Sequence, residues 1–397
     1  MKAIEKEFFI PFVLVTSLFA LWGLANNMTD TLLAAFRKIM QMSDTQTSFI
    51  QMAFYGAYFC IALPAALYIR KHSYKSGVIL GLVMYASGAM LFLPAAEAES
   101  YAFYLIAIYI MAAGCSVLET TANPYIMSMG SQETATRRLN IAQSFNPIGS
   151  IMGIMVSKYF ILQDISLYSI SGTYAVLGGV LLAIMVVMFF ANMPEGQSTD
   201  DREMALAATF RRLARNKRYI WGVVAQFFYV GAQIGAWSFT IRLVMKELGV
   251  VEAEAATIYL VSIIGFCLSR FVYTWLMEWI APGQLLAMGS VLSAVSAIMV
   301  VLCSGWLAVG SLVLVSVFMS LMFPTIYGIA LGSVSESDHS DDTKIGASGL
   351  IMAILGGALL TPLQGIVSDA AGINMSYLVP LSCFVVVLCY AFYTIKR

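Results

Sequence analysis

The sequence predicts an all-α membrane protein of twelve transmembrane helices, arranged as two halves of six helices each. Of its 397 residues, 60% are hydrophobic and 11% are charged, whereas about 25% of the residues of an average soluble domain are charged. The mean hydropathy of the whole chain is +0.83. Twelve apolar segments are long enough to cross a bilayer, which takes about 20 residues of helix. Because such long runs exclude membrane strands, we expect helices.

The twelve predicted spans follow one another along the chain, and the ends of the third and ninth are the least defined. In order, they lie near residues 8–35, 47–69, 76–94, 101–128, 138–162, 170–192, 218–245, 254–278, 283–303, 306–332, 344–368 and 374–394. The first apolar run is too long for a cleavable signal peptide and has no cleavage site, so we expect it to be the first span.

The distribution of Lys and Arg predicts the orientation of these spans. If the N-terminus is cytoplasmic, 16 of the 22 Lys and Arg residues lie in cytoplasmic segments, five lie at the outer ends of spans, and Arg270 lies within a span. Basic residues are enriched in cytoplasmic loops. We therefore expect a multi-pass protein of the cell inner membrane with both termini in the cytoplasm.

The longest polar stretch, from Asn192 to Arg218, divides the spans six and six. We expect an N-terminal half at 1–192, a cytoplasmic linker at 193–217 and a C-terminal half at 218–397. A faint repeat supports two related halves, since a proline motif in span four (Asn123-Pro124) recurs in span ten (Phe323-Pro324). Two repeats around a site near the bilayer midplane are a known transporter plan.

The sequence has no pattern for catalysis or for a cofactor. The six cysteines lie in apolar runs, the two histidines have no neighbours at metal-ligand spacing, and no nucleotide-binding loop occurs. The formal net charge is zero, which does not indicate a nucleic-acid partner. We expect no enzymatic activity, no metal and no cofactor, so that a gradient across the membrane supplies the free energy.

Two carboxylates, Asp30 and Glu119, lie in the middle of apolar spans one and four. A charged side chain near the bilayer centre costs about 2.5–3.5 kcal/mol on insertion scales, and such residues usually line paths for protons, ions or substrates. Asn123 follows Glu119 by one turn, and Pro124 can kink the helix there. We predict that Glu119 and Asp30 couple transport to protons. The alternative for Glu119 is a structural ion pair with a neighbour such as Arg270.

Polar amides mark one face of span one and one face of span five. Asn26, Asn27 and Asp30 are three and four residues apart, and Gln143 and Asn146 are three residues apart. Amides and carboxylates supply the donors and acceptors that sugar hydroxyls need, although amides also join helices to one another in membranes. We predict that Asn27, Asp30, Gln143 and Asn146 bind the substrate.

Span seven carries a stripe of alternating amide and aromatic residues: Gln226, Tyr229, Gln233 and Trp237, at offsets of three, four and four. Aromatic rings can stack on the C–H faces of a sugar while amides bind its hydroxyls. The alternative is that the rings only fill space between helices. We predict that all four residues bind the substrate.

Six segments together resemble the fucose–galactose–glucose proton symporters of the major facilitator superfamily, and the resemblance covers nearly all of the chain. They are Ala25-Asn-Asn-Met-Thr-Asp30, Gln51-Met-Ala-Phe-Tyr55, Leu118-Glu-Thr-Thr-Ala-Asn-Pro124, Arg138-Leu-Asn-Ile-Ala-Gln-Ser-Phe-Asn146, Ala225-Gln-Phe-Phe-Tyr-Val-Gly-Ala-Gln233 and Val367-Ser-Asp-Ala-Ala-Gly372. The resemblance implies that Asp30 and Glu119 match the family's two essential carboxylates. It also implies that Asn27, Gln143 and Asn146 match cavity residues. The chain departs from the family at Thr29 and Pro147.

We therefore predict a proton-coupled symporter that imports L-fucose or a related hexose by alternating access, with the proton gradient as its energy source. Its partners are the sugar, the proton and the lipid bilayer, and we expect a monomer. An importer of another hexose, such as glucose or galactose, is the alternative that the resemblance leaves open. A proton-driven exporter of amphipathic compounds would need a mostly apolar cavity, which the amide stripes do not favour.

Overall fold

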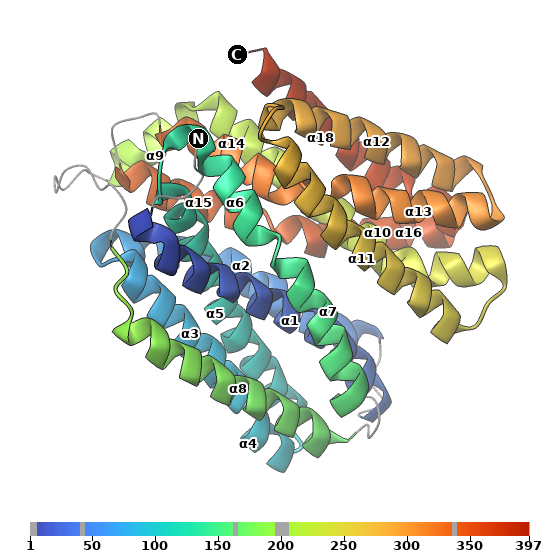
Figure 1. The fold of residues 1–397 in the computed structure, drawn as a ribbon. Helices are drawn as coiled ribbons and strands as arrows, with labels where there is room; N and C mark the ends of the chain where they lie inside the picture. The colour runs from blue at the N-terminus through green and yellow to red at the C-terminus, as the bar shows by residue number, and fades with distance from the viewer. Residues whose placement is uncertain (1–5, 40–43, 162–165, 195–205, 336–339, 397) are drawn as a thin grey trace. The chain divides into compact units, whose positions relative to one another are not determined.

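The computed structural model describes residues 6–39, 44–161, 166–194, 206–335 and 340–396, and the regular elements in this part of the chain are all helices (Figure 1). The all-α prediction is confirmed. Among these residues, nine helices have the length and composition to cross a membrane, and Phe9–Ala25 is a shorter apolar segment. The predicted spans outside those nine helices, at 8–35, 138–162 and 218–245, also lie on helices over their described residues, with a short turn inside the second of them.

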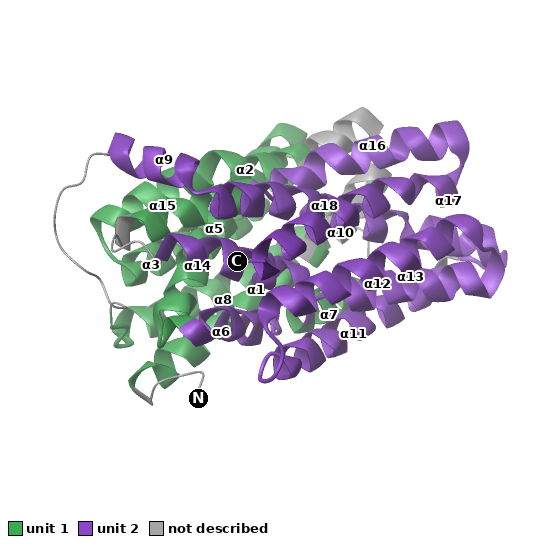
Figure 2. Cartoon of the chain, turned by 90° about the horizontal axis from the view of Figure 1, so that it is seen from above, with its two compact units in different colours: residues 1–132, 148–204, 338–352 green, residues 133–147, 205–337, 353–397 purple. Residues whose placement is uncertain are grey.

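The chain forms two compact units, each assembled from three stretches of sequence (Figure 2). Unit 1 comprises residues 1–132, 148–204 and 338–352, and unit 2 comprises residues 133–147, 205–337 and 353–397. The start of span five therefore belongs to unit 2, and the start of span eleven belongs to unit 1. The division into an N-terminal half, a linker and a C-terminal half stays a prediction.

Unit 1 is built mostly from long apolar helices, and serine caps the start of three of them. The helices of unit 1 are α1 (Phe9–Ile39), α2 (Asp44–Lys71), α3 (Tyr74–Met90), the short α4 (Phe92–Glu97), α5 (Tyr101–Ser128), α8 (Leu167–Phe190), α15 (Ser340–Met352) and most of α7 (Asn146–Val156), with a 3₁₀ turn, η1 (Lys6–Phe8), and a π-helical segment, η3 (Ser157–Ile161). Ser73, Ser100 and Ser166 cap α3, α5 and α8, because each side chain accepts a hydrogen bond from a backbone N–H three residues later.

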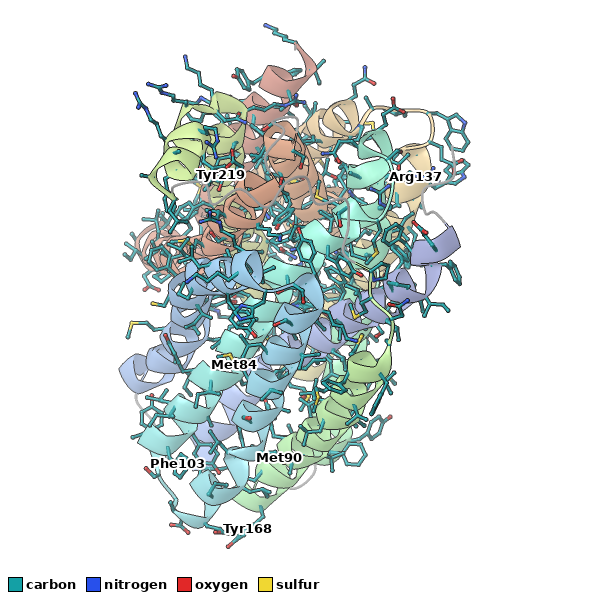
Figure 3. All side chains as sticks on the ribbon, turned by 90° about the vertical axis from the view of Figure 1, so that its left-hand side faces the viewer. Met84, Met90, Phe103, Arg137, Tyr168 and Tyr219 are labelled. Carbon is teal, nitrogen blue, oxygen red and sulfur yellow. The ribbon has the colours of Figure 1, made fainter. Side chains whose placement is uncertain are left out.

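Helix α5 forms the core of unit 1, where every residue from Met111 to Met127 is buried. It packs against α2 and α3 along its length. Figure 3 shows Met90, Phe103 and Tyr168 at one end of this unit, where α3 ends and α5 and α8 begin. A buried helix of this kind is an unfavourable place for polar groups, so the carboxylate and amide that it carries require a functional or structural reason.

Helix α8 carries the apolar surface expected of a helix in lipid. It has no charged residue, and Phe190, Tyr168 and Val176 are 80%, 76% and 70% exposed. A contiguous exposed apolar surface marks an interaction with a membrane or another protein. The exposed side chains of α8 therefore support the assignment of this helix as a span.

Unit 2 is centred on α10, which packs against α11, α13, α14, α16 and α18. Its helices are α6 (Ala135–Gln143), which follows η2 (Gln132–Thr134), then α9 (Leu206–Arg215), α10 (Lys217–Leu248), α11 (Glu252–Leu276), α12 (Pro282–Leu302), α13 (Gly305–Met319), α14 (Met322–Ser335), α16 (Leu355–Ala371), α17 (Ile373–Ser376) and α18 (Leu378–Ile395). Asn216 caps the start of α10 by accepting a hydrogen bond from the N–H of Tyr219 at 3.1 Å. Gly249, with a φ of +64°, ends it in the left-handed conformation that favours glycine.

Several predicted spans consist of two helices in the structure. Span five is divided into α6 and α7 by a turn before Pro147, and span ten is divided into α13 and α14 just before Pro324. Proline lacks an N–H and disfavours helical geometry in the residue before it, so it is tolerated best in the first turn of a new helix. Helix α5, in contrast, continues through Pro124.

Candidate functional site

Glu119 is buried on α5 in unit 1, with 9% of its surface exposed. Tyr58 and Cys115 lie close enough to interact with it electrostatically. Among the described residues of unit 1, no basic side chain forms an ion pair with Glu119. A carboxyl group in such a place can be held as a neutral acid within the helix bundle and can give up its proton where water reaches it.

Helix α1 carries the polar stripe of span one. Asn27 is half-buried, and its Nδ2 donates a hydrogen bond to the backbone oxygen of Gly23 at 3.1 Å. One donor of this amide is therefore used within its own helix. The side chains of Asn26 and Asp30 lie outside the described residues. The assignment of Asn27 and Asp30 to a substrate site stays a prediction.

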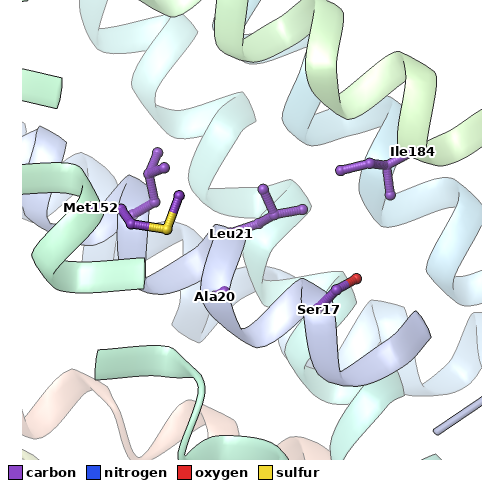
Figure 4. A pocket seen from close by; sticks show the side chains of 6 residues that line it. Ser17, Ala20, Leu21, Met152 and Ile184 are labelled. Carbon is purple, nitrogen blue, oxygen red and sulfur yellow. The ribbon is translucent and has the colours of Figure 1, made fainter. Parts of the chain in front are cut away.

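Unit 1 also has a cavity of about 120 Å³ between α1, α7 and α8 (Figure 4). Its lining residues are Ser17, Ala20, Leu21, Leu24, Met152 and Ile184. Ser17 has the one polar side chain among these lining residues, and its hydroxyl donates to the backbone oxygen of Leu14 at 2.7 Å. Because a sugar site needs polar groups that fix the orientation of its ligand, we do not assign this cavity to a sugar.

Helix α10 carries the stripe of span seven in unit 2. Gln226 and Tyr229 are fully buried, whereas Gln233 and Trp237 are half-buried. Neither amide atom of Gln226 has a hydrogen-bond partner among the described residues. An unpaired buried polar atom costs about 1–3 kcal/mol, so a glutamine kept in this state needs a reason other than stability.

Trp237 begins a series of contacts that leads to Arg270. Its Nε1 donates to the hydroxyl of Ser316 at 3.2 Å, and its ring packs edge-on against Phe266, with 5.0 Å between the ring centroids. The guanidinium of Arg270 lies 4.6 Å from the centroid of the Phe266 ring, a cation–π contact. From the sequence, Arg270 was expected only as a structural ion-pair partner of Glu119. The position of this charged residue within a span was the sequence feature that could have indicated a functional role for Arg270.

Gln143 and Asn146 flank the break in span five, because Gln143 is the last residue of α6 and Asn146 is the first residue of α7. Their predicted common face assumed a continuous helix, and the turn at Ser144–Phe145 replaces that geometry. Gln143 is 4% exposed, and its backbone oxygen accepts a hydrogen bond from Arg270 Nη1 at 2.9 Å. Asn146 is half-buried. The structure thus joins the backbone of Gln143 to the Arg270 cluster, while substrate contacts by both amides stay predictions.

The site residues offer hydrogen bonds, aromatic rings and a buried carboxyl group. Among the described residues, no group of three or more His, Cys, Asp or Glu side chains is placed to hold a metal ion. The described site residues can bind a polar ligand through hydrogen bonds and ring stacking, and the carboxyl group can carry a proton.

The chain as a whole is similar to proteins of a known family. Residues 14–341 match the Major Facilitator Superfamily. The chain is 40% identical to the L-fucose-proton symporter of Haemophilus influenzae, with 98% of each chain covered. It is 36% identical to the L-fucose-proton symporter of Escherichia coli, with 98% of this chain and 93% of the relative covered.

A solved structure agrees with these sequence relatives. The crystal structure of the transporter FucP in the outward conformation matches with a TM-score of 0.89 and 35% identity, and the match covers 98% of this chain and 99% of FucP. The resemblance to the fucose–galactose–glucose proton symporters is thereby confirmed. The chain belongs to the Major Facilitator Superfamily, whose twelve-helix fold it shares.

Proposed function

We propose that this protein is a proton-coupled symporter that imports L-fucose or a related hexose by alternating access. The observation that carries the proposal is the full-length similarity to L-fucose-proton symporters at 40% identity, together with a buried carboxyl group at Glu119. The unpaired buried amide of Gln226 supports a polar rather than an amphipathic cargo.

Each predicted site residue has a role in this proposal. Glu119 carries the proton, and Asp30 both binds the sugar and responds to protonation. The other sugar contacts are Asn27, Gln143, Asn146, Gln226, Tyr229, Gln233 and Trp237. The half-buried ring of Trp237 is held by Ser316 and Phe266, which favours a fixed surface on which a sugar can stack.

The proton gradient can supply the free energy for accumulation. A membrane potential of 100 mV supplies about 2.3 kcal/mol for each charge that crosses, and about 1.4 kcal/mol corresponds to a tenfold concentration ratio. One proton per sugar therefore supports roughly 50-fold accumulation before any pH difference is added. We further propose that the protein is a monomer of the cell inner membrane, with both termini in the cytoplasm and no enzymatic activity.

Uptake into vesicles tests the proposal. The purified protein is placed in lipid vesicles, and the uptake of labelled L-fucose, galactose and glucose is measured with and without an imposed pH gradient. We expect accumulation of L-fucose that requires the gradient and is abolished by a protonophore. Accumulation of glucose or galactose alone would change the substrate assignment. Movement of an amphipathic dye with no sugar uptake would favour the exporter instead.

A further inference from the structure

Two backbone oxygens in unit 2 lack their usual helical partner because of proline. In an α-helix, each N–H donates to the carbonyl oxygen four residues earlier, and proline has no N–H. Pro147 therefore cannot bond the oxygen of Gln143, and Pro324 cannot bond the oxygen of Ser320. The two prolines lie in spans five and ten, in the first turns of α7 and α14.

Arg270 binds both of these oxygens. Its Nε donates to the backbone oxygen of Ser320 at 2.7 Å, and its Nη1 donates to the backbone oxygen of Gln143 at 2.9 Å. The side chain is 3% exposed, and the ring of Phe266 covers the guanidinium. Because a guanidinium holds its donors in a rigid planar fork, one side chain can fix two oxygens that belong to two different helices.

Other contacts attach α6 to the same part of unit 2. Thr325, on α14, donates to Oδ1 of Asn140 at 3.4 Å, and Arg137 (labelled in Figure 3) forms an ion pair with Glu278. Helix α6 is thus held near its start by Arg137 and at its last residue by Arg270. The second contact is the one next to a predicted sugar ligand.

We propose that Arg270 is a positioning residue for the transport site. By holding the backbone oxygens of Gln143 and Ser320, the Arg270 clamp fixes the interrupted ends of spans five and ten, and so sets the direction in which the Gln143 side chain meets the sugar. The effect on sugar rests on the proposed function, whereas the clamp itself does not. In this role Arg270 acts on the sugar only through Gln143, without contacting the sugar itself.

Two substitutions of Arg270 test the clamp. Arg270→Met removes the donors and keeps an unbranched chain, and Arg270→Lys keeps the charge but replaces the fork with a single point of contact. For Arg270→Met we expect sugar affinity, measured by calorimetry, to fall about tenfold or more, as for a lost charge-assisted hydrogen bond. The melting temperature of the sugar-free protein should fall as well. Arg270→Lys should give intermediate values of both.

The prolines provide the sharper test. Pro147→Ala and Pro324→Ala supply N–H groups that compete with Arg270 for the two oxygens. In this double background we expect Arg270→Met to cause a clearly smaller loss of affinity and of melting temperature than in the native background. Pro362→Ala is the matched control, since Pro362 lies inside α16 of the same unit. The oxygen that Pro362 cannot bond is that of Ala358, and the two oxygens that Arg270 bonds are those of Ser320 and Gln143. The effects of Pro362→Ala should add to those of Arg270→Met.

Additive effects in the double-alanine background would overturn the clamp, as would an Arg270→Met protein with unchanged affinity and melting temperature. If Arg270→Met does not fold, Arg270→Lys enters the same cycle in its place. A native protein that binds no sugar would reject the proposed function, while non-additive melting temperatures would still support the clamp.

Discussion

Replacement of Gln226 by Met separates a substrate contact from structural hydrogen bonding. Gln226 is fully buried on α10, and both its amide oxygen and its amide nitrogen are unpaired among the described residues. Met has a similar length and adapts to irregular gaps, and it has no group that requires a strong hydrogen bond. We therefore expect the variant to be more stable than the native protein in the absence of sugar and to bind sugar more weakly.

The magnitudes follow from the two unpaired atoms. Each buried unpaired atom costs about 1–3 kcal/mol, and we expect a net gain near the lower end, about 1–2 kcal/mol, because polar side chains in a membrane also find partners in the unfolded state. Two neutral hydrogen bonds to sugar hydroxyls contribute about 1–3 kcal/mol in total. Their loss corresponds to roughly 5- to 150-fold weaker binding.

Thermal unfolding in detergent and calorimetry with L-fucose measure the two effects. Gln364→Met is the matched control, because Gln364 is also fully buried in unit 2 and has no predicted contact with sugar. Its Nε2 donates to the hydroxyl of Ser376 at 3.4 Å, while its Oε1 is unpaired among the described residues. We expect the control to leave sugar affinity unchanged. A Gln226→Met protein that is less stable than the native protein and binds sugar normally would refute the reasoning and make Gln226 a structural amide.

Three further substitutions test other parts of the molecule. Glu119→Gln should abolish gradient-driven accumulation while sugar exchange continues, because the amide mimics a permanently protonated acid; normal accumulation in vesicles would exclude Glu119 as the coupling residue. Asp30→Asn should weaken sugar binding roughly 10- to 150-fold, the worth of a charge-assisted hydrogen bond, and unchanged affinity between pH 5 and 8 would remove Asp30 from the site. Gly149→Ala should destabilise the protein by about 1–3 kcal/mol, because the added Cβ would overlap the backbone oxygen of Ala20. Gly179→Ala, which meets nothing within 4 Å, should melt close to the native temperature.

The sequence was sufficient to predict the helical class and the positions of the spans, because hydropathy over about 20 residues is a strong signal. It did not predict where a span is divided. The chain breaks before Pro147 and Pro324, whereas α5 continues through Pro124. The kink that Pro124 can cause within α5 stays a prediction. The oxygens of Gln143 and Ser320, which Pro147 and Pro324 cannot bond because proline has no N–H, accept hydrogen bonds from Arg270, a residue more than a hundred positions after Gln143.

The same limit applies to the candidate site. Spacing along span seven placed Gln226 and Tyr229 on one face, and the structure buries both. Spacing along span five failed to describe Gln143 and Asn146, because it presumed a helix without a break. Arg270, Phe266 and Ser316 received no role from any motif, since their cluster is formed only when α10, α11 and α13 pack together.

The structure adds a second observation to the faint internal repeat. In unit 1, Gly149 follows the break in span five and lies so close to span one that a Cβ would overlap the backbone oxygen of Ala20. In unit 2, Gly356 lies in the first turn of α16, just after span eleven is divided between α15 and α16, and a Cβ there would overlap the backbone oxygen of Phe227 in span seven. Span eleven lies six spans after span five, and span seven lies six spans after span one. Two six-helix repeats that share one packing plan would account for this recurrence.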